Sequence, residues 1–509
     1  MTLPGRADCC WTATASQTSY PILKKSARTD VAVVGAGIVG LTLAYALVRA
    51  GLSVTVLEAR RVGRQVTGRS TAKVTSQHSL IYHHLRSTFD LDTARLYAEA
   101  NRAGVEQIRT WVHQLAISCD WEQKHAYTYT CDKSQVTDIE KEAELARELG
   151  FEAEAISRAP LPFETAGALR FANEAQFNPT RYLIGLAGVV AAAGGIIFEN
   201  TRVTKVAFDK HWQLTAENGR LDADHLVLAT NLPTAGPGNY DARTRPRGHI
   251  AMAFRMKFEA ALEGMFIGID QPTHSLRMGR DQEGALLVVL GPAFITGQEG
   301  DVAARFRELE RWTRNNLPVG EVAWRWVNED YDTVDRVPYV GQPSQKSQRL
   351  YIATGFNGWG ISNGTAAGLL INDQIQGRSN PWSKLYDPRR RGPRKYNKGG
   401  DTQSYVRSID NIRRGHGGVL KVGKDKIAVW KSSRGQVHAL SASCTHAGCT
   451  VTWNNADLTW DCPCHGSMFS ADGKVIHGPA VKPLATKKPT GKATRDSKHR
   501  GHRGSGVRR

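Results

Sequence analysis

Four side chains between residues 444 and 465 could together hold a metal centre. Cys444 and His446 form a C-x-H pair, Cys462 and His465 form a C-x-x-H pair, and fifteen residues separate the two pairs. Two thiolates and two imidazoles are the ligand set of a Rieske [2Fe-2S] cluster, in which the cysteines hold one iron and the histidines the other. The neutral imidazoles raise the reduction potential above that of all-cysteine ferredoxins. Tetrahedral zinc is the alternative, but zinc fingers pair Cys with Cys and His with His.

The residues around these ligands resemble the Rieske proteins of cytochrome bc-type complexes, through the sequences C-T-H-A-G-C and C-P-C-H-G-S. The resemblance implies a disulfide between Cys449 and Cys464, and a hydroxyl at Ser467 that donates to a bridging sulfide. Where those proteins carry a Tyr that hydrogen-bonds a ligand sulfur, this chain has Phe469. Because one hydrogen-bond donor is lost, we expect a potential below that of bc-type clusters.

A nucleotide-binding fingerprint lies near the N-terminus, where we expect the first folded element to begin at Asp30. A Val-rich strand at 31–34 leads into an apolar helix from Ile38 to about Ala50. The glycines at this junction stand in G-x-G-x-x-G spacing: Gly35, Gly37 and Gly40. Glycines permit a tight turn and let a pyrophosphate approach the helix N-terminus, where exposed N–H groups and the helix dipole favour its charge. A purely structural glycine turn is the alternative.

An acidic residue completes this fingerprint. A second predicted strand, 54–57, ends at Glu58, twenty-one residues beyond Gly37. A carboxylate there can accept hydrogen bonds from the adenosine ribose hydroxyls, and its charge would repel a 2'-phosphate. The strand, the glycines, the helix and the acid together predict a dinucleotide site.

Two further segments resemble FAD-dependent oxidoreductases of the D-amino-acid-oxidase-like (DAO) superfamily: the polar stretch 60–78, and 351–370, where a strand and glycines precede a small-residue helix. From about residue 10 to 484, the chain resembles bacterial FAD-dependent oxidoreductases of this kind with a C-terminal Rieske domain. The fingerprint and the resemblance together imply one bound FAD, contacted by Gly35, Ala36, Gly37, Gly40, Glu58, Ala59, Arg60, Ser70, Thr71, Lys73, Val203, Gly355, Gly360, Ile361 and Ser362.

The resemblance implies an electron relay. A small organic donor of the amine or amino-acid class is oxidised by the flavin, and electrons then pass singly to the cluster and on to an external acceptor: a protein, a quinone or oxygen. Our candidate substrate contacts are His249, Arg277 and Tyr339, and no side chain is assigned a catalytic role. At 291–297 the chain departs from the Gly/His-rich turn that related chains carry beside the substrate cavity, so we expect a different substrate.

Three other functions remain open. An NAD(P)H-dependent flavin/Rieske reductase would need a site for the nicotinamide cofactor, but the sequence contains one G-x-G-x-x-G fingerprint rather than two. A Rieske oxygenase would need a mononuclear-iron triad of two His and a carboxylate, for which no cluster stands out. A non-enzymatic electron carrier or redox sensor could hold both cofactors without turning over a substrate.

The elements that position these motifs predict an α/β doubly wound FAD-binding domain with an antiparallel β cap, followed by a small all-β Rieske domain. In the Rieske domain we expect short strands at 419–422, 427–430 and 437–440. The expected boundaries are an N-terminal arm at 1–29, the oxidoreductase domain at 30–377 (FAD-binding pieces about 30–75, 179–233 and 332–377, with cap pieces between), a basic linker at 378–401, the Rieske domain at 402–484 and a basic disordered tail at 485–509.

Composition limits the remaining possibilities. The chain has 509 residues, of which 41% are hydrophobic and 23% charged, which suits two or three globular domains. Its net charge of +19 lies mostly in 378–414 and 487–509, which we interpret as solvated segments rather than a nucleic-acid surface. Weak contact with nucleic acid or an anionic surface is the alternative. The chain contains no run of eighteen apolar residues and no secretory signal, so we expect a cytoplasmic protein, with peripheral membrane association as an option.

Overall fold

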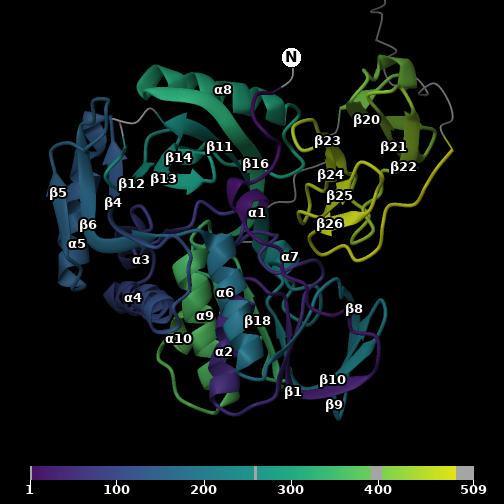
Figure 1. The fold of residues 1–509 in the computed structure, drawn as a ribbon, viewed down its shortest axis with the longest axis horizontal. Coiled ribbons are helices and arrows are strands. Elements are labelled where there is room, and N and C mark those ends of the chain that lie inside the picture. Colours follow the sequence, from purple (N-terminus) through teal and green to yellow (C-terminus); the bar gives the residue numbers. More distant parts are fainter. Residues whose placement is uncertain (1–2, 257–260, 391–403, 489–509) are drawn as a thin grey trace, which may run out of the picture.

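Three bodies of β-structure build the part of the chain that the computed structural model describes, residues 3–256, 261–390 and 404–488 (Figure 1). They are a sheet of eight strands, a sheet of ten strands, and a C-terminal module of two four-stranded sheets. Within these residues, none of the helices combines the length and the apolar character needed to cross a bilayer. The architecture is therefore the expected FAD-binding domain with a cap and a small all-β domain.

The eight-stranded sheet is the nucleotide-binding layer. Its strands follow the order β17-β18-β10-β1-β2-β7, and the β8–β9 hairpin extends it from β10. The neighbours from β18 to β7 run parallel, and β2 is buried along its whole length, as expected for a parallel strand covered on both faces. The strands are β1 (Ala27–Val34), β2 (Val54–Leu57), β7 (Ile196–Phe198), β8 (Val203–Asp209), β9 (His211–Ala216), β10 (Arg220–Leu228), β17 (Tyr339–Gly341) and β18 (Leu350–Thr354).

Helices α2 (Ile38–Arg49), α6 (Pro179–Ala192) and α9 (Gly360–Ile375) pack beside one another along this sheet (Figure 1). Glycines allow the close approach of α9 to α2. A Cβ atom at Gly364 would lie 2.7 Å from Cγ2 of Ile38, and one at Gly368 would lie 2.7 Å from Cγ2 of Thr42. Both helices therefore bring their N-termini to the same edge of the sheet.

The ten-stranded sheet forms the cap, with β15-β11-β14-β13-β12-β4-β6-β3 as its main path, β16 beside β11 and β5 beside β6. Most of its pairs are antiparallel, and only β12 and β4 pair in parallel among them. The strands are β3 (Lys73–Val74), β4 (Glu122–Thr130), β5 (Ala153–Ile156), β6 (Gly167–Gln176), β11 (Thr244–Met256), β12 (Met265–Gly268), β13 (Ser275–Asp281), β14 (Gly284–Leu290), β15 (Phe294–Ile295) and β16 (Val319–Thr333).

Five α-helices of the described residues lie in the cap segments: α3 (Ile81–Thr88), α4 (Leu91–Gln114), α5 (Val136–Glu148), α7 (Tyr240–Arg243) and α8 (Val302–Asn316). One of them departs from the expected division, because α4 lies in a segment that we assigned to the cap yet packs against α9. Gly104 permits this contact, since a Cβ there would lie 2.4 Å from the carbonyl oxygen of Ser362. Helix α4 thus supports the α9 N-terminus from outside.

The C-terminal module contains the sheets β19-β20-β21-β22 and β23-β24-β25-β26. Its loops 442–451 and 462–467 carry the four candidate cluster ligands. They lie at the same end of the second sheet, because Thr452 at the start of β23 pairs with Asp461 at the end of β24. Figure 1 shows the module, in yellow-green and yellow, next to β16 and to α7 (Tyr240–Arg243). The strands are β19 (Tyr405–Val406), β20 (His416–Val422), β21 (Asp425–Lys431), β22 (Val437–Ser441), β23 (Thr452–Asn454), β24 (Thr459–Asp461), β25 (Met468–Ser470) and β26 (Val475–His477).

The prediction that folded structure begins at Asp30 is wrong. Helix α1 (Cys10–Thr14) precedes it, and β1 already begins at Ala27. Trp11 on α1 is buried, and its indole N–H donates to the carbonyl of Ser70 at 3.0 Å. The sequence did not indicate this helix, because five residues without a capping side chain carry no helical period.

The prediction that the linker is a flexible solvated segment is also wrong for its described first part. Residues 378–390 include α10 (Trp382–Tyr386). Arg390 is largely buried, its Nε lies 2.8 Å from the buried Asp335 Oδ2, and its guanidinium stacks 3.9 Å from the ring centre of Tyr339. A charge count could not reveal this ion pair, because its partner lies 55 positions away. The rest of the linker, from 391, and the tail from 489 lie outside the described residues.

Candidate functional site

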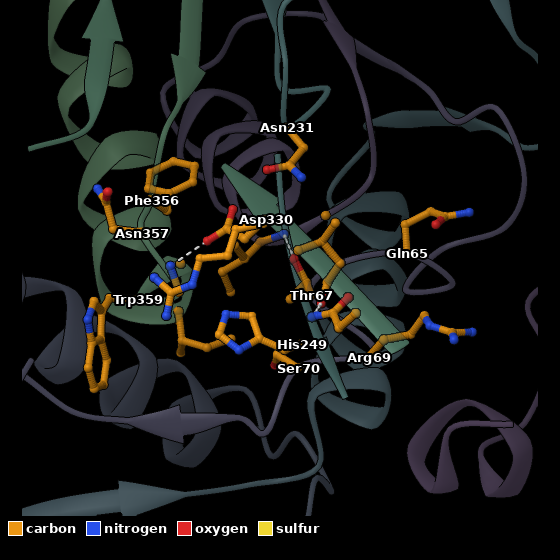
Figure 2. Close-up of a pocket in the computed structure, with 18 of the residues that line it drawn as sticks. Gln65, Thr67, Arg69, Ser70, Asn231, His249, Asp330, Phe356, Asn357 and Trp359 are labelled. Atoms are coloured by element: carbon orange, nitrogen blue, oxygen red, sulfur yellow. Dashed lines mark hydrogen bonds between the residues drawn. The ribbon is translucent and has the colours of Figure 1, made fainter. Parts of the chain in front are cut away.

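A cavity of about 850 Å³ lies where the nucleotide-binding sheet, the cap and the C-terminal module meet. It is lined by the glycine loop, by the stretch after β2, by the cap strands β11 and β16, by the α9 N-terminus and by residues 476–478 of the module. Figure 2 shows part of this lining, with His249 and Asp330 between the rings of Phe356 and Trp359 and the loop residue Thr67. A cavity of this size and shape can enclose an extended dinucleotide with a small molecule beside it.

The glycine loop has the geometry of a phosphate cradle. Gly35 has φ +109°, and a Cβ there would lie 2.4 Å from the carbonyl oxygen of Ala229. Gly37 caps α2, and the next amide, of Ile38, donates to Oγ1 of Thr67 at 3.3 Å. Gly40 does not line the cavity; a Cβ there would lie 1.9 Å from the Gly35 carbonyl oxygen. The first two glycines shape the loop, and the third lets the helix pack under it.

Glu58 holds the loop from the end of β2. Its carboxylate accepts the backbone N–H of Ala36 at 2.9 Å and that of Arg60 at 2.8 Å. Burial raises the pKa of Glu58. Two carboxylate oxygens offer about four lone pairs, so the side chain can still accept ribose hydroxyls. A carboxylate that accepts hydrogen bonds in this way fits the adenosine end of FAD.

The stretch after β2 reaches across the cavity to the cap. Ser70 and Thr71 line the cavity, and the buried Lys73 donates from Nζ to the Phe266 carbonyl at 2.6 Å and to Ser275 Oγ at 2.5 Å. Burial, assisted by a nearby Arg, lowers the pKa of Lys73 to about 7. This lysine therefore connects the FAD-binding segment to β12 and β13.

The α9 N-terminus faces the cavity through Gly360, Ile361 and Ser362. His78 supports it: its Nε2 lies 3.0 Å from Ser362 Oγ, and its ring stacks 4.6 Å from that of Trp359. Burial lowers the pKa of His78 to about 3, so the ring is neutral. A helix N-terminus in this position can stabilise negative charge on a reduced flavin.

The remaining candidate FAD contacts include residues that line the cavity and one that does not. Ala59 and Val203 line the cavity, whereas Gly355 does not. Gly355 has φ +77°, and a Cβ there would lie 2.3 Å from Cγ2 of Thr333. Gly355 therefore serves the turn before α9 rather than the cavity surface.

Of the three substrate candidates, only His249 lines the cavity. Both of its ring nitrogens are buried, the ring faces the Gly291 backbone, and burial together with Arg247 lowers its pKa well below the ordinary value. A neutral imidazole has one donating and one accepting nitrogen, so His249 can form a hydrogen bond with a bound molecule.

Arg277 and Tyr339 are structural residues. The Arg277 guanidinium donates to the carbonyls of Thr71, Ala72 and Phe177. The Tyr339 ring lies between two guanidinium groups, 4.1 Å from that of Arg243 and 3.9 Å from that of Arg390. Neither side chain lines the cavity. Each contacts residues that are distant in the sequence, and the sequence could not reveal these partners.

Charged residues that the sequence analysis missed line the cavity beside His249. Arg247 on β11 lies 2.9 Å from Asp332 on β16. Asp330 accepts the Gly358 amide at 2.6 Å, and burial raises its pKa to about 6. The alternating acids in N-E-D-Y-D (328–332) were a usable signal, since alternate residues of a strand share one face.

Strand β16 is a wall with two different faces. Asn328, Asp330 and Asp332 line the cavity. On the other face the Tyr331 hydroxyl donates to the backbone carbonyl of His465 at 3.0 Å, and a Cβ on Gly466 would lie 2.2 Å from Glu329. One strand therefore separates the cavity from the loop that carries two candidate cluster ligands.

The candidate cluster ligands are brought together. The Cys462 thiol hydrogen-bonds Cys444 and lowers the pKa of Cys444 to about 6, which favours a thiolate. The rings of His446 and His465 lie 4.9 Å apart, edge to face. The two cysteines thus contact each other and the two histidines contact each other, a pairing that fits the two irons of a Rieske cluster.

The two extra cysteines form a disulfide. The sulfurs of Cys449, Cys462 and Cys464 lie within 4.8 Å of one another, but Cys449 and Cys464 are bonded to each other and tie the two loops together. They are therefore not available as thiolates. Ser467 is fully buried next to Cys444, and Phe469 is fully buried in the module's core.

The module packs onto the FAD-binding domain at several points. The Gln65 amide donates to the Ile476 carbonyl at 3.3 Å, and Ile476, His477 and Gly478 line the cavity. Residues 291–297, expected beside the substrate, do not line it. Gly297 instead meets the cluster loop, since a Cβ there would lie 2.6 Å from the Pro463 nitrogen. The segment at 291–297 therefore lies against the docked module at Gly297 rather than along the cavity.

Two family models match the chain, one for each domain, and known proteins match one or both domains. The sequence model of the family described as FAD dependent oxidoreductase (DAO) matches residues 30–374, and that of the Rieske [2Fe-2S] domain matches residues 403–488. The putative Rieske 2Fe-2S iron-sulfur protein YhfW of Bacillus subtilis (strain 168) is 31% identical over 490 residues, which cover 93% of this chain and 96% of that protein. Gamma-glutamylputrescine oxidoreductase of Escherichia coli (strain K12) is 24% identical over 370 residues, 70% of this chain and 86% of that protein.

Solved structures resemble the FAD-binding part. L-proline dehydrogenase from P. horikoshii matches with a TM-score of 0.59 and 19% identity over 72% of this chain and 98% of that one. Glycine oxidase from Geobacillus kaustophilus matches with a TM-score of 0.58 and 17% identity over 72% of this chain and 100% of that one. At such identities the similarity shows a shared fold.

Proposed function

Because this chain belongs to the DAO family of FAD-dependent oxidoreductases and carries a Rieske [2Fe-2S] domain, we propose that it oxidises a small amine or amino acid and passes the electrons through the cluster to an external acceptor. FAD and the cluster are its cofactors. FAD, when bound, supplies two-electron oxidation of a donor and one-electron release. The main support for the proposal is the position of strand β16, which has the cavity on one face and the cluster loop on the other.

The cavity-lining candidates are the residues that we propose to hold FAD. Gly35, Gly37 and Glu58 would bind the pyrophosphate and ribose, and the α9 N-terminus at Gly360 would face the flavin ring. Gly40 and Gly355 would contribute by shaping the backbone around them. The geometry supports these roles because the amides, the carboxylate and the open backbone are present together.

We propose that the donor binds beside β11 and β16. Arg247 can attract a carboxylate, Asp330 can attract an ammonium group, and the neutral His249 can accept a hydrogen bond from the donor nitrogen. Both charge signs at one site suit an amino acid or a related amine. Two similar proteins, named for gamma-glutamylputrescine and L-proline, support the same donor class.

We propose Cys444, His446, Cys462 and His465 as the cluster ligands. Their spacing, their mutual contacts and the disulfide that ties their loops support this set. His465 is 1% exposed and faces β16, whereas His446 is exposed. Electrons would therefore enter on the His465 side and leave on the His446 side to a protein, quinone or oxygen acceptor.

Anaerobic titration of the holoenzyme tests the proposal. A panel of amines, amino acids and NAD(P)H would be added while flavin absorbance and the EPR signal of the reduced cluster are followed together. We expect an amine-type donor to bleach the flavin, and the cluster signal to grow afterwards. His249→Ala should raise the donor concentration needed, while Glu217→Gln, at an exposed position outside the cavity, serves as a comparison.

Three outcomes would overturn the proposal. If NAD(P)H alone reduces the flavin, the protein is a reductase that feeds the cluster. If every donor fails while dithionite reduces both cofactors, the protein is an electron carrier or redox sensor. A bleached flavin with a silent cluster would refute the relay itself.

A further inference from the structure

A carboxylate of the oxidoreductase domain lies close to a histidine of the Rieske domain. Asp241 lies on α7, and its Oδ2 is 3.3 Å from Nε2 of His465. The His465 side chain is 1% exposed, whereas that of Asp241 is 35% exposed. The contact joins two residues 224 positions apart in two different domains, so it exists only while the domains are docked.

We propose that Asp241 is a positioning residue that holds His465 through Nε2 and lowers the reduction potential of the cluster in the docked protein. The inference rests on the proposed role of His465 as a cluster ligand. With Nε2 facing the carboxylate, iron would be held through Nδ1 of the same ring. A carboxylate on the second nitrogen of a metal-binding histidine fixes the ring orientation and makes the ligand more basic.

A second contact from the same domain grips the same residue. The buried Tyr331 hydroxyl donates to the His465 backbone carbonyl at 3.0 Å. His465 is thus held by its side chain from α7 and by its backbone from β16. His446 lies on an exposed loop, 445–448, which the oxidoreductase domain does not cover to the same extent. The two histidines of the group therefore have different surroundings.

The sign of the effect follows from charge. A nearby negative charge favours the oxidised cluster over the reduced one, because reduction adds an electron. A more basic ligand acts in the same direction. The docked cluster should therefore release its electron to an acceptor more readily than a cluster without this carboxylate.

Asp241→Asn tests the inference, because it keeps the side-chain shape and removes the charge. The midpoint potential of the holoenzyme cluster would be measured by mediated titration with EPR detection, which requires no substrate. We expect the reduction equilibrium to shift about tenfold toward the reduced form, the order of one contact with a charged group, or about 59 mV upward for one electron. Asp241→Glu, which restores the charge, should recover part of the shift.

Asp222→Asn is the matched control. Asp222 also faces a histidine in the same domain, with its Oδ2 3.6 Å from Nε2 of His211, but neither residue belongs to the cluster group. This variant should leave the potential unchanged. Tyr331→Phe tests docking without a change of charge and should shift the potential less than Asp241→Asn.

An unchanged potential in Asp241→Asn would overturn the inference, as would an equal shift in Asp222→Asn or Tyr331→Phe. Because no donor enters the measurement, such a result would leave the proposed amine oxidation intact. A failed donor panel would conversely leave the potential shift intact.

Discussion

Gly297 offers the sharpest test of how the two domains dock. Its φ is +71°, and a Cβ there would lie 2.6 Å from the nitrogen of Pro463 and 2.9 Å from the carbonyl carbon of Cys462. These are backbone atoms of the loop that carries two proposed cluster ligands, so they cannot rotate away. Ordinary carbon contacts need about 3.5 Å, so Gly297→Ala must move the loop by roughly 1 Å.

The free-energy cost of Gly297→Ala has two parts. Alanine in the left-handed region costs about 1–2 kcal/mol, which destabilises the FAD-binding domain whether or not the domains are docked. Overpacking costs about 1–3 kcal/mol and is relieved when the module moves away. That second part should weaken docking roughly 5- to 150-fold, since about 1.4 kcal/mol is a factor of ten.

Anaerobic stopped-flow measures the consequence. The flavin of the holoenzyme would be photoreduced, and the growth of the reduced-cluster signal would be timed. We expect Gly297→Ala to slow cluster reduction, by at most the factor by which docking is weakened, because the rate follows the docked fraction. Flavin photoreduction should be unchanged. Gly300→Ala is the control, because Gly300 lies in the same loop with no atom within 4 Å of the added Cβ.

The reasoning is refuted if Gly297→Ala transfers electrons as fast as the wild type. It is also refuted if Gly300→Ala slows the transfer equally, because the effect would then come from the loop in general. Loss of the cluster in Gly297→Ala, read from the iron content, would show instead that the contact is needed for cluster assembly rather than for docking.

Three further outcomes are expected. Phe469→Tyr should raise the cluster potential by roughly 40 mV, the equivalent of one net hydrogen bond of about 1 kcal/mol, and an unchanged titration would contradict the role assigned to the missing hydroxyl. Glu58→Gln should weaken FAD binding about 10-fold or more, since a hydrogen bond to a charged group contributes about 1.5–3 kcal/mol; flavin fluorescence measures the dissociation constant, and Glu217→Gln, an exposed acid, should leave it unchanged. Burial raises the pKa of Glu142 to about 7 from an ordinary 4.5. The folded protein therefore keeps a proton that the unfolded chain releases, and the free energy of unfolding should fall as the pH rises from about 4.5 to 7, by up to roughly 3 kcal/mol. Glu142→Gln should flatten this slope in denaturant titrations at several pH values, and an unaltered slope would contradict the assignment.

The spacing of residues within short segments was enough to predict the cofactors and three strands of the Rieske domain. The G-x-G-x-x-G fingerprint with Glu58, and the two Cys/His pairs, are short patterns in which every participant lies within about twenty positions, so one sequence displays them completely. The strands expected at 419–422, 427–430 and 437–440 are confirmed by β20, β21 and β22, because short apolar runs bounded by turn residues mark short strands.

Long-range partners account for the failed predictions. Arg277 looked like a substrate contact, but three backbone carbonyls hold it under the cavity. Helix α1 depends on Trp11, whose hydrogen-bond partner is 59 positions away. Composition cannot identify such partners, because a buried charge and an exposed charge have the same letter in a sequence.

The sequence by itself determined the chemistry of this protein: a dinucleotide cradle, a Cys2His2 group and the family to which both belong. Only the tertiary structure decided how these parts meet. It placed Asp330 and Tyr331 on opposite faces of β16, and it brought Asp241 to His465. The physical reason is that motif spacing is a property of one short segment, whereas docking depends on two surfaces whose shape exists only after each domain has folded.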